Sequence, residues 1–359
     1  MRKIALMVVA LLAVLSVQAA GKNLLWDTEH LLALNSDDDE YKSIVRDAEL
    51  YLKQPIPLIT EKLETLSGDN HNYESLATYF WPNQEDSTAS YVVRDGHKNP
   101  ERLKYDGNKI NVFARHCSIL AKAYAITHDA KYSDRWIEEV SSWFIDEETI
   151  MNPHLEYAQI IKNRNNNQGQ YFGIIDAYVL IDVVESIELM RKEKVLNNDE
   201  YNNIQSWFWQ FSSWLETSAL GKSMDSAPNN LSIAYDIMMC EFLSLCGNEQ
   251  AIVQRANSFT RKRLYKQFLA NGSQPEEMKR AKPISYCIYN LQHVLDFCRI
   301  MQNNGIKYYR QNRRRIDAAI EFVERHLTYE GVLVKAEESQ RTHYMKQLDD
   351  MKAAFKQLR

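Results

Sequence analysis

Helical patterns follow one another along nearly the whole chain, and little interrupts them. Only 11 of the 359 residues are Gly and 8 are Pro, the two residues that most disfavour a helix interior. The stretches between them are rich in Leu, Ala, Glu, Lys and Met. No alternation of strand and helix appears, which argues against a parallel sheet. We therefore predict an all-α fold in which successive antiparallel helix pairs close into a ring.

The predicted helices are assigned from apolar residues at helical spacing and from helix breakers at their ends. They cover residues 39–52, 56–66, 108–127, 132–144, 171–190, 198–220, 231–246, 249–269, 283–304, 307–328 and about 334 to the end. Two long connections, 71–106 and 147–170, interrupt this series. Long ordered loops are often functional, and the alternative for the first is a loop that its aromatic residues merely pin to the core.

Residues 1–20 have the pattern of a secretory signal peptide. Two basic residues precede the apolar run Ile4–Val17, which is too short for a comfortable membrane span. We expect cleavage near Ala19 or Ala20 and a periplasmic or secreted product. No break in composition divides the rest, so we predict one domain over residues 21–359.

The charge and cysteine content exclude several functions. A net charge of −5 predicts no basic surface for nucleic acid, although it leaves room for a local basic cleft that binds an acidic substrate. The five cysteines are odd in number and have no metal-site spacing, so we predict buried free thiols; they are Cys117, Cys240, Cys246, Cys287 and Cys298.

The stretch Asn271–Leu291 contains a tyrosine and an arginine whose local setting suits proton transfer. Pro283 suits the first position of a helix, because its fixed φ fits the helix and its missing N–H would be unpaired there. Tyr286 then lies in the first turn, where the helix dipole favours negative charge, and Arg280 is close in sequence. Both effects should lower the pKa of a phenol from about 10, which suits proton transfer. The alternative is an ordinary helix start with two packing tyrosines, Tyr286 and Tyr289.

Other polar residues have a structural as well as a functional interpretation. Asn229 and Asn230 precede a predicted helix, and Asn is a preferred N-cap residue. His116 lies inside a predicted helix, where a single histidine is more often a satisfied core or surface residue. The run Asn165–Gln168 offers amide donors and acceptors, but loop asparagines commonly only close turns.

Eight short motifs follow one another along the chain: YFWPN (79–83), VRDG (93–96), NPE (99–101), WFIDEETIMNPHLEYAQ (143–159), GIIDAY (173–178), WLETSALGK (214–222), NNLSIAYD (229–236) and GSQPEEMKRAKPISYCIYNL (272–291). Taken together and in order, they resemble the alginate lyase superfamily, the helical-toroid polysaccharide lyases. The resemblance runs from Tyr79 to Leu291 and implies that the ring of helices is an incomplete (α/α) toroid.

The resemblance implies β-elimination of a 4-linked uronic acid polymer, an acidic polysaccharide, without a cofactor or a metal. The family Asn that neutralises the sugar carboxylate, and so stabilises an enolate-like transition state, matches Asn230. The family Tyr that acts as base, acid or both on the C5 proton and the leaving O4 matches Tyr286, and the Arg that supports it matches Arg280. Further substrate contacts are expected from Asn229, Tyr235, Tyr289, Arg94, Trp81, Tyr79, Asn167, Gln168 and His116.

One position departs from the family pattern. The His that follows the family Asn is Leu231 here, and an isobutyl group neither accepts a proton nor donates a hydrogen bond. If Tyr286 alone serves as base and acid, the C5 proton and O4 must lie on the same side of the sugar ring. They do so in mannuronate and glucuronate but not in guluronate. We therefore expect cleavage of alginate mannuronate blocks or glucuronan.

Two other functions remain open. A catalytically impaired relative would bind a uronate polysaccharide without cleaving it. A glycoside hydrolase on the same fold would need two carboxylates that face each other across the cleft. Glu276 and Glu277 are adjacent in sequence and cannot span that gap alone.

Overall fold

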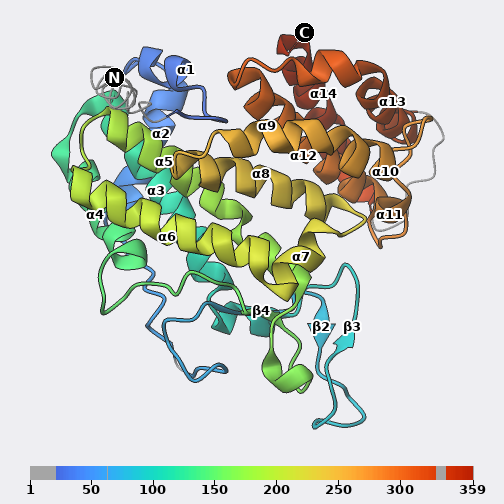
Figure 1. Cartoon of the computed structure of the whole chain (residues 1–359), viewed down its shortest axis with the longest axis horizontal. Coiled ribbons are helices and arrows are strands. Elements are labelled where there is room, and N and C mark those ends of the chain that lie inside the picture. The colour runs from blue at the N-terminus through green and yellow to red at the C-terminus, as the bar shows by residue number, and fades with distance from the viewer. Residues whose placement is uncertain (1–21, 63, 329–336, 359) are drawn as a thin grey trace, which may run out of the picture.

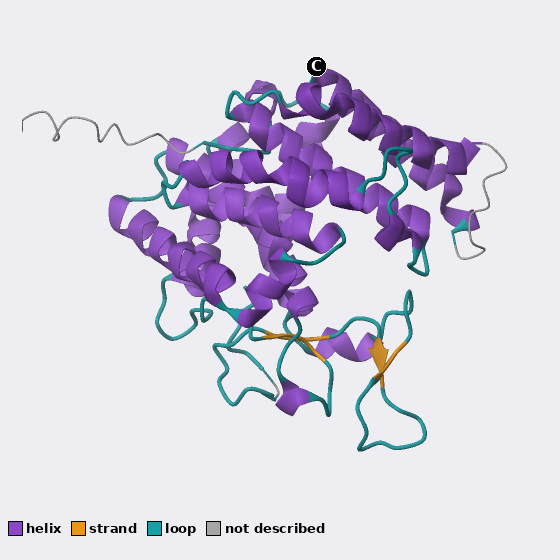
Figure 2. Cartoon of the chain, turned by 45° about the vertical axis from the view of Figure 1, so that its right-hand side comes forward, coloured by secondary structure: helices purple, strands orange, loops and turns teal. Residues whose placement is uncertain are grey.

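The computed structural model of the protein describes residues 22–62, 64–328 and 337–358, and helices make up most of it (Figures 1 and 2). The α-helices are α1 (Thr28–Ala33), α2 (Asp39–Tyr51), α3 (Gly107–Thr127), α4 (Ala130–Phe144), α5 (Leu180–Lys192), α6 (Asn198–Thr217), α7 (Ala219–Asp225), α8 (Asn230–Leu245), α9 (Gln250–Phe259), α10 (Tyr265–Gln267), α11 (Pro275–Met278), α12 (Pro283–Asn303), α13 (Tyr308–Thr328) and α14 (Arg341–Gln357). Short 3-10 or π segments are η1 (Pro100–Lys104), η2 (Asn165–Asn167), η3 (Tyr171–Val179), η4 (Thr260–Leu264) and η5 (Glu338–Gln340). The strands are β1 (Glu74–Leu76), β2 (Phe80–Trp81), β3 (Val92–Val93) and β4 (Tyr157–Ile160).

The helices pack as successive neighbours around one apolar core. Helix α3 contacts α2, α4 and α5, while α12 contacts α8, α13 and α14. The core draws buried side chains from Leu24 to Leu358. The predicted all-α fold, an (α/α) toroid, is confirmed.

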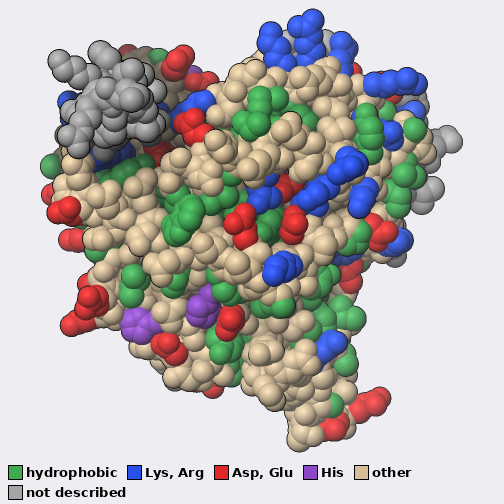
Figure 3. Space-filling view, viewed as in Figure 1, with side chains coloured by type: hydrophobic (Ala, Val, Ile, Leu, Met, Phe, Trp, Pro, Cys, Tyr) green, Lys and Arg blue, Asp and Glu red, His purple; other side chains and the backbone are tan. Residues whose placement is uncertain are grey.

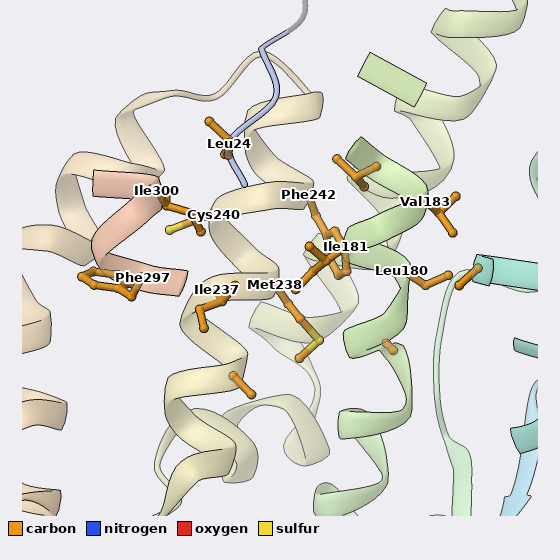
Figure 4. Close-up of a cluster of buried hydrophobic side chains, with 14 of the residues drawn as sticks. Leu24, Leu180, Ile181, Val183, Ile237, Met238, Cys240, Phe242, Phe297 and Ile300 are labelled. Atoms are coloured by element: carbon orange, nitrogen blue, oxygen red, sulfur yellow. The ribbon is translucent and has the colours of Figure 1, made fainter. Parts of the chain in front are cut away.

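Helix α8 lies at the centre of this core. It contacts α5, α6, α7, α9 and α12, and nearly all of its residues are buried. Most of its side chains are apolar, and such a helix is stable only when it is enclosed; its buried Asp236 is paired with Arg255 and Arg263. Figure 4 labels buried apolar side chains of α8 and of two of its neighbours: Leu180, Ile181 and Val183 from α5, Ile237, Met238, Cys240 and Phe242 from α8, and Phe297 and Ile300 from α12.

The two long connections form an irregular layer on one side of the helices (Figure 2). Strand β1 pairs in parallel with β4, and β2 pairs with β3 as an antiparallel hairpin. Buried Asp106 joins this layer to α3: its carboxylate accepts the backbone N–H of Glu74 at 3.0 Å and pairs with Lys62 at 2.7 Å and with Lys109 at 3.2 Å. The layer is therefore held in a fixed place beside the helix ends.

The predicted helix over residues 56–66 is wrong. The described residues of this segment are turns and irregular backbone. Backbone carbonyls that a helix would pair internally bind side chains here, beginning with that of Pro57. Its carbonyl instead accepts the indole N–H of Trp143 at 3.1 Å, and Lys62 donates to the carbonyls of Ile59 and Asn70. The segment predicted as a helix from residue 171 also begins as the 3-10 segment η3 and becomes α-helical only at Leu180.

The cysteines are free, and all but the partly buried Cys246 are buried. No helix in the described part of the chain is both long and apolar enough to cross a membrane. Among the same residues no group of His, Cys, Asp and Glu side chains has the makings of a metal site. Residues 1–20 lie outside the described residues, so the signal peptide and the domain limits stay predictions.

Glu188 gives the fold a dependence on pH. Burial raises the pKa of its carboxyl to about 7, from 4.5, and one of its oxygens is buried without a hydrogen-bond partner. The folded state therefore holds the proton more tightly than the unfolded state, so stability falls as pH rises from about 4.5 to about 7. Since Gln cannot ionise, we expect Glu188→Gln to change Tm little at pH 5 and to raise it at pH 8. Thermal unfolding of the variant and the parent at both pH values measures this, and Glu138→Gln, at an exposed position, is the control. An equal Tm difference between variant and parent at pH 5 and pH 8 would contradict the prediction.

Candidate active site

A pocket of about 960 Å³ lies between the irregular layer and the N-terminal ends of α8 and α12. It brings together residues that are far apart in the sequence and that the motifs had singled out. Of the predicted site residues it contains Tyr79, Asn229, Asn230, Arg280, Tyr286 and Tyr289, together with Leu231.

Arg280 is the centre of this pocket. Its guanidinium donates to the Tyr286 hydroxyl at 2.7 Å and lies over the same ring, 3.8 Å from the centroid. It also forms a two-point ion pair with Asp95, at 2.9 and 3.3 Å. The Tyr79 hydroxyl lies 3.0 Å from the Tyr286 hydroxyl. Two phenols, a cation and a carboxylate thus form one connected network.

The local sequence explains why Tyr286 faces this network. Pro283 opens α12, so the chain turns between Arg280 and the first helical turn and both side chains reach the same side. Neither Lys282 nor any other side chain at the helix start caps α12. The Glu337 carboxylate, distant in sequence, accepts the N–H groups of Ile284 and Ser285 at 3.2 and 2.8 Å instead.

The pKa of Tyr286 shifts in the direction opposite to the one predicted. Burial and the neighbouring Tyr79 hydroxyl raise the pKa of Tyr286 well above its usual value, and Arg280 offsets only part of this rise. The prediction counted the cation and the helix start but not the loss of water around the phenol. Tyr286 therefore keeps its proton in the free protein.

Asn230 lies at the first turn of α8 and is buried. Its side-chain nitrogen is 2.9 Å from both carboxylate oxygens of Glu277, and its backbone N–H donates to the same group at 2.8 Å. Burial raises the pKa of Glu277. The amide is therefore fixed in orientation, and neutralising a sugar carboxylate cannot rest on Asn230 alone.

Further charges give the pocket a positive balance. Lys98, Arg102 and Lys282 line it, and among the described residues none of the three forms an ion pair. Of the two acidic residues in the lining, Asp95 is neutralised by Arg280. Asp176 accepts hydrogen bonds from Tyr73, Ser75 and Gln159, and burial raises its pKa. The local basic cleft that the sequence left open is present.

Several of these residues were missed at the sequence level. Asp95 belongs to the quoted VRDG motif, but we chose its neighbour Arg94. Gln159 ends another quoted motif and lines the pocket with φ at 51°, a left-handed conformation that is uncommon outside Gly. Its side-chain amide donates to Asp176 at 2.8 Å. Lys98 and Arg102 carried no recognisable pattern.

Other predicted contacts lie outside the pocket lining. Trp81 and Arg94 lie on the β2–β3 hairpin, where the guanidinium is 5.3 Å from the indole centroid and the indole N–H donates to the His97 carbonyl. Asn167 and Gln168 lie in and after η2, and their hydrogen bonds are local to that loop.

Two predicted contacts are buried away from the pocket, contrary to expectation. His116 is 1 % exposed, and its ring bonds to Glu139 at 2.7 Å and to Gln54 at 3.2 Å. Tyr235 is 3 % exposed and donates to the Leu215 carbonyl at 3.0 Å. Both follow the helical period inward, as the structural interpretation of His116 required.

A helical toroid with a cationic cleft built around a tyrosine and an arginine has the architecture of the helical-toroid polysaccharide lyases. The chain belongs to the alginate lyase family, because the family model described as alginate lyase matches residues 59–331. No curated protein sequence matches the chain significantly.

Two solved structures are similar to this chain. An alginate lyase from Bacteroides ovatus is 29 % identical, with a TM-score of 0.83, and the alignment covers 95 % of this chain and 96 % of that one. A variant of alginate lyase A1-III in complex with a tetrasaccharide is 13 % identical, with a TM-score of 0.57 and coverage of 91 % and 82 %. The second similarity shows the shared fold alone.

The raised pKa of Tyr286 is directly measurable. We expect its phenol to remain protonated beyond pH 10, because burial removes the water that would solvate the anion. Protein carrying carbon-13 at the tyrosine Cζ atoms would be titrated by NMR, with Tyr286→Phe to assign the resonance and free tyrosine as the reference. Ionisation of Tyr286 below pH 8 would show that Arg280 outweighs burial.

Proposed function

We propose that the protein is a polysaccharide lyase that cleaves a 4-linked uronic acid polymer by β-elimination, with Tyr286 as the proton carrier. The observation that carries this proposal is the Tyr286 hydroxyl, held by Arg280 at 2.7 Å in a cationic pocket that also contains Asn230. A titratable group that a cation orients inside a cleft is a candidate for acid–base work.

In the proposed elimination a single oxygen, that of the Tyr286 phenol, both donates a proton and accepts one. The Tyr286 hydroxyl gives its proton to O4 as the C4–O4 bond breaks, and the same oxygen takes the proton from C5. The electron pair of the C5–H bond forms the C4=C5 double bond. The phenol ends neutral, one product carries an unsaturated sugar, and the other carries a free hydroxyl.

The high pKa of Tyr286 is consistent with this order of events. A neutral phenol already holds the proton that O4 needs, so no resting tyrosinate is required. Arg280 donates to the phenol oxygen, and Tyr79 lies at hydrogen-bond distance from it. Both can stabilise negative charge that develops there in the transition state.

The sugar carboxylate must be neutralised for the C5 proton to leave. We assign this task jointly to Asn230 and to the unpaired cations Lys98, Arg102 and Lys282 that line the pocket. Charge-assisted contacts with a carboxylate are stronger than those from a neutral amide. The Asn230 side-chain nitrogen already lies 2.9 Å from both Glu277 oxygens, so the cations carry the larger share of this task.

A single tyrosine that acts on both the C5 proton and O4 needs them on the same side of the sugar ring. This requirement supports mannuronate or glucuronate as the substrate. None of the described residues that line the pocket is a histidine, and Leu231 occupies the wall where the family has one. Without a second base, an elimination whose proton and leaving oxygen lie on opposite faces lacks a proton acceptor. Guluronate blocks are therefore excluded from the proposed substrates.

An impaired, binding-only relative is the second candidate, and Leu231 is the observation that favours it. A hydrolase is less well supported, since Asp95 is committed to Arg280 and Asp176 to three hydrogen-bond donors. Neither carboxylate is free to act as a nucleophile or base.

On the pattern of residues 1–20 we also propose that the enzyme acts after export.

The tyrosine assignment has a direct test. We expect Tyr286→Phe to slow cleavage by about 10²–10⁴-fold, the usual cost of losing an acid or base, while polymer binding changes little. Ultraviolet absorbance of the unsaturated product measures the rate on polymannuronate, glucuronan and polyguluronate.

Tyr235→Phe is the matched control, because that phenol is buried outside the pocket. Undiminished cleavage by the Tyr286 variant would show that another group carries the proton. Cleavage of polyguluronate by the parent protein would refute the single-tyrosine mechanism. Tight binding without any cleavage would favour the binding-only relative.

Restoring an imidazole should broaden the substrate range. We expect Leu231→His to gain measurable cleavage of polyguluronate, because a second proton acceptor then lines the pocket. Leu231→Gln, which is polar and of similar length but not basic at neutral pH, should not gain it. Equal activity of the two variants on polyguluronate would contradict a role for the imidazole as a base.

A further inference from the structure

A dense group of cations covers part of the surface that the active site does not use. We define it as the α9–α13 basic surface, formed by exposed Arg261, Lys262, Lys266, Lys307, Arg310 and Arg314. Figure 3 shows Lys and Arg side chains gathered over α9, α10 and α13. The Thr260 side chain is hydrogen-bonded to Tyr308 and Asn312, so the two helical segments that carry these cations lie side by side.

Few acids balance this surface, although Asp317 of α13 pairs with the nearby Arg313 at 2.8 Å. Residues 250–267 contain five Lys or Arg and residues 307–316 contain five more, and neither stretch has an Asp or Glu. In the described parts of the chain, none of the six side chains of the basic surface forms an ion pair. The net charge of −5 did not reveal this surface, because it averages over faces that differ strongly; the expectation that the protein binds no nucleic acid stays a prediction.

Neighbouring arginines have a different environment. Buried Arg263 pairs with Asp236 and Asp225, and Arg255 pairs with Asp236 at 2.5 Å. These two guanidiniums serve the fold. The exposed cations beside them have no such partner, so folding alone does not explain their presence.

Two features of the backbone add to this argument. Lys307 and Arg310 flank the start of α13, which has no acid in its first turn, although the helix dipole there favours anions. Arg261 and Lys262 lie in η4, a π-helical segment, and such segments are rare and frequent at functional sites. The arrangement stabilises a bound anion and is unfavourable without one.

The surface also presents an aromatic ring suited to a sugar. Tyr265 is 54 % exposed, and the Arg315 guanidinium lies 4.8 Å from its ring centroid. Arg315 is fixed by donating to the Phe268 carbonyl at 3.0 Å. A flat ring bordered by cations fits a polymer in which each sugar carries a carboxylate.

We propose that the α9–α13 basic surface is a second binding site for a linear uronate polysaccharide, remote from the pocket. The proposal rests on the proposed function, which supplies a polymer of matching charge. None of the pocket-lining residues belongs to α9, α10 or α13. A polysaccharide held at this surface has a raised effective concentration of its other segments at the cleft. Counterions are released when the polysaccharide binds, so its binding depends on salt.

The test measures binding rather than turnover. In a Tyr286→Phe background, fluorescein-labelled polymannuronate and a mannuronate tetramer are titrated at low and moderate salt. The surface variant is Arg261→Gln with Lys262→Gln and Lys266→Gln. The control removes the same charges elsewhere, as Lys42→Gln, Arg46→Gln and Lys53→Gln. We expect the surface variant to bind the polymer about tenfold more weakly than the parent at low salt, with a shallower salt dependence. Its affinity for the tetramer should equal that of the parent. The control should match the parent.

Each outcome decides between the proposals. If the tetramer binds but the surface variant binds the polymer as tightly as the control, the second site is refuted. If the parent binds neither ligand, the proposed function itself is wrong. Loss of binding to duplex DNA or to anionic lipid vesicles with unchanged polymer binding would assign the surface to another partner. A second variant, Lys307→Gln with Arg310→Gln and Arg314→Gln, guards against misfolding of the first, and thermal unfolding checks both.

Discussion

The cleft depends on one guanidinium. Arg280 is bonded to Asp95 on the loop after β3 and to Tyr286 on α12, so a single side chain joins the irregular layer to the helical body. Arginine suits this position because it stays charged and offers several donors in a fixed plane. The Ala281 N–H adds a third bond to Asp95 at 3.0 Å. Breaking this junction would leave a half-buried carboxylate and a phenol without their partner, and the pocket would lose one wall.

Buried carboxylates hold the rest of the irregular backbone in the same way. Glu185 accepts the N–H groups of residues 24–26, Glu74 those of residues 66 and 67, and Glu337 two at the start of α12. Glu277 does the same for Asn230. Backbone donors that no helix or sheet satisfies need an acceptor when they are buried, and a carboxylate supplies two oxygens. Buried carboxylates thus satisfy backbone N–H groups both in loops and at helix starts.

The sequence predicted the helices because an apolar stripe repeats every three to four residues, and it predicted the pocket residues because motifs from distant stretches converge there. Its errors have physical causes. The segment 56–66 has the residues of a helix, but the carbonyls of Pro57 and Ile59 bind the side chains of Trp143 and Lys62 instead. Arg94 and Asp95 are adjacent in one motif, and which of them faces the pocket depends on the turn after β3, whose path the motif does not specify. The pKa of Tyr286 depends on how much water is excluded, which only the packed structure reveals.

Leu231 lines the same pocket as Tyr286, whose pKa is raised by burial and by the neighbouring Tyr79 hydroxyl. An imidazole in the pocket wall would bring a second titrating group and its water of solvation. An isobutyl group brings neither. If Tyr286 carries the proton as proposed, its phenol holds that proton until the surrounding cations have neutralised a substrate carboxylate. The charge of the bound sugar, rather than the pH of the medium, then sets when the proton moves.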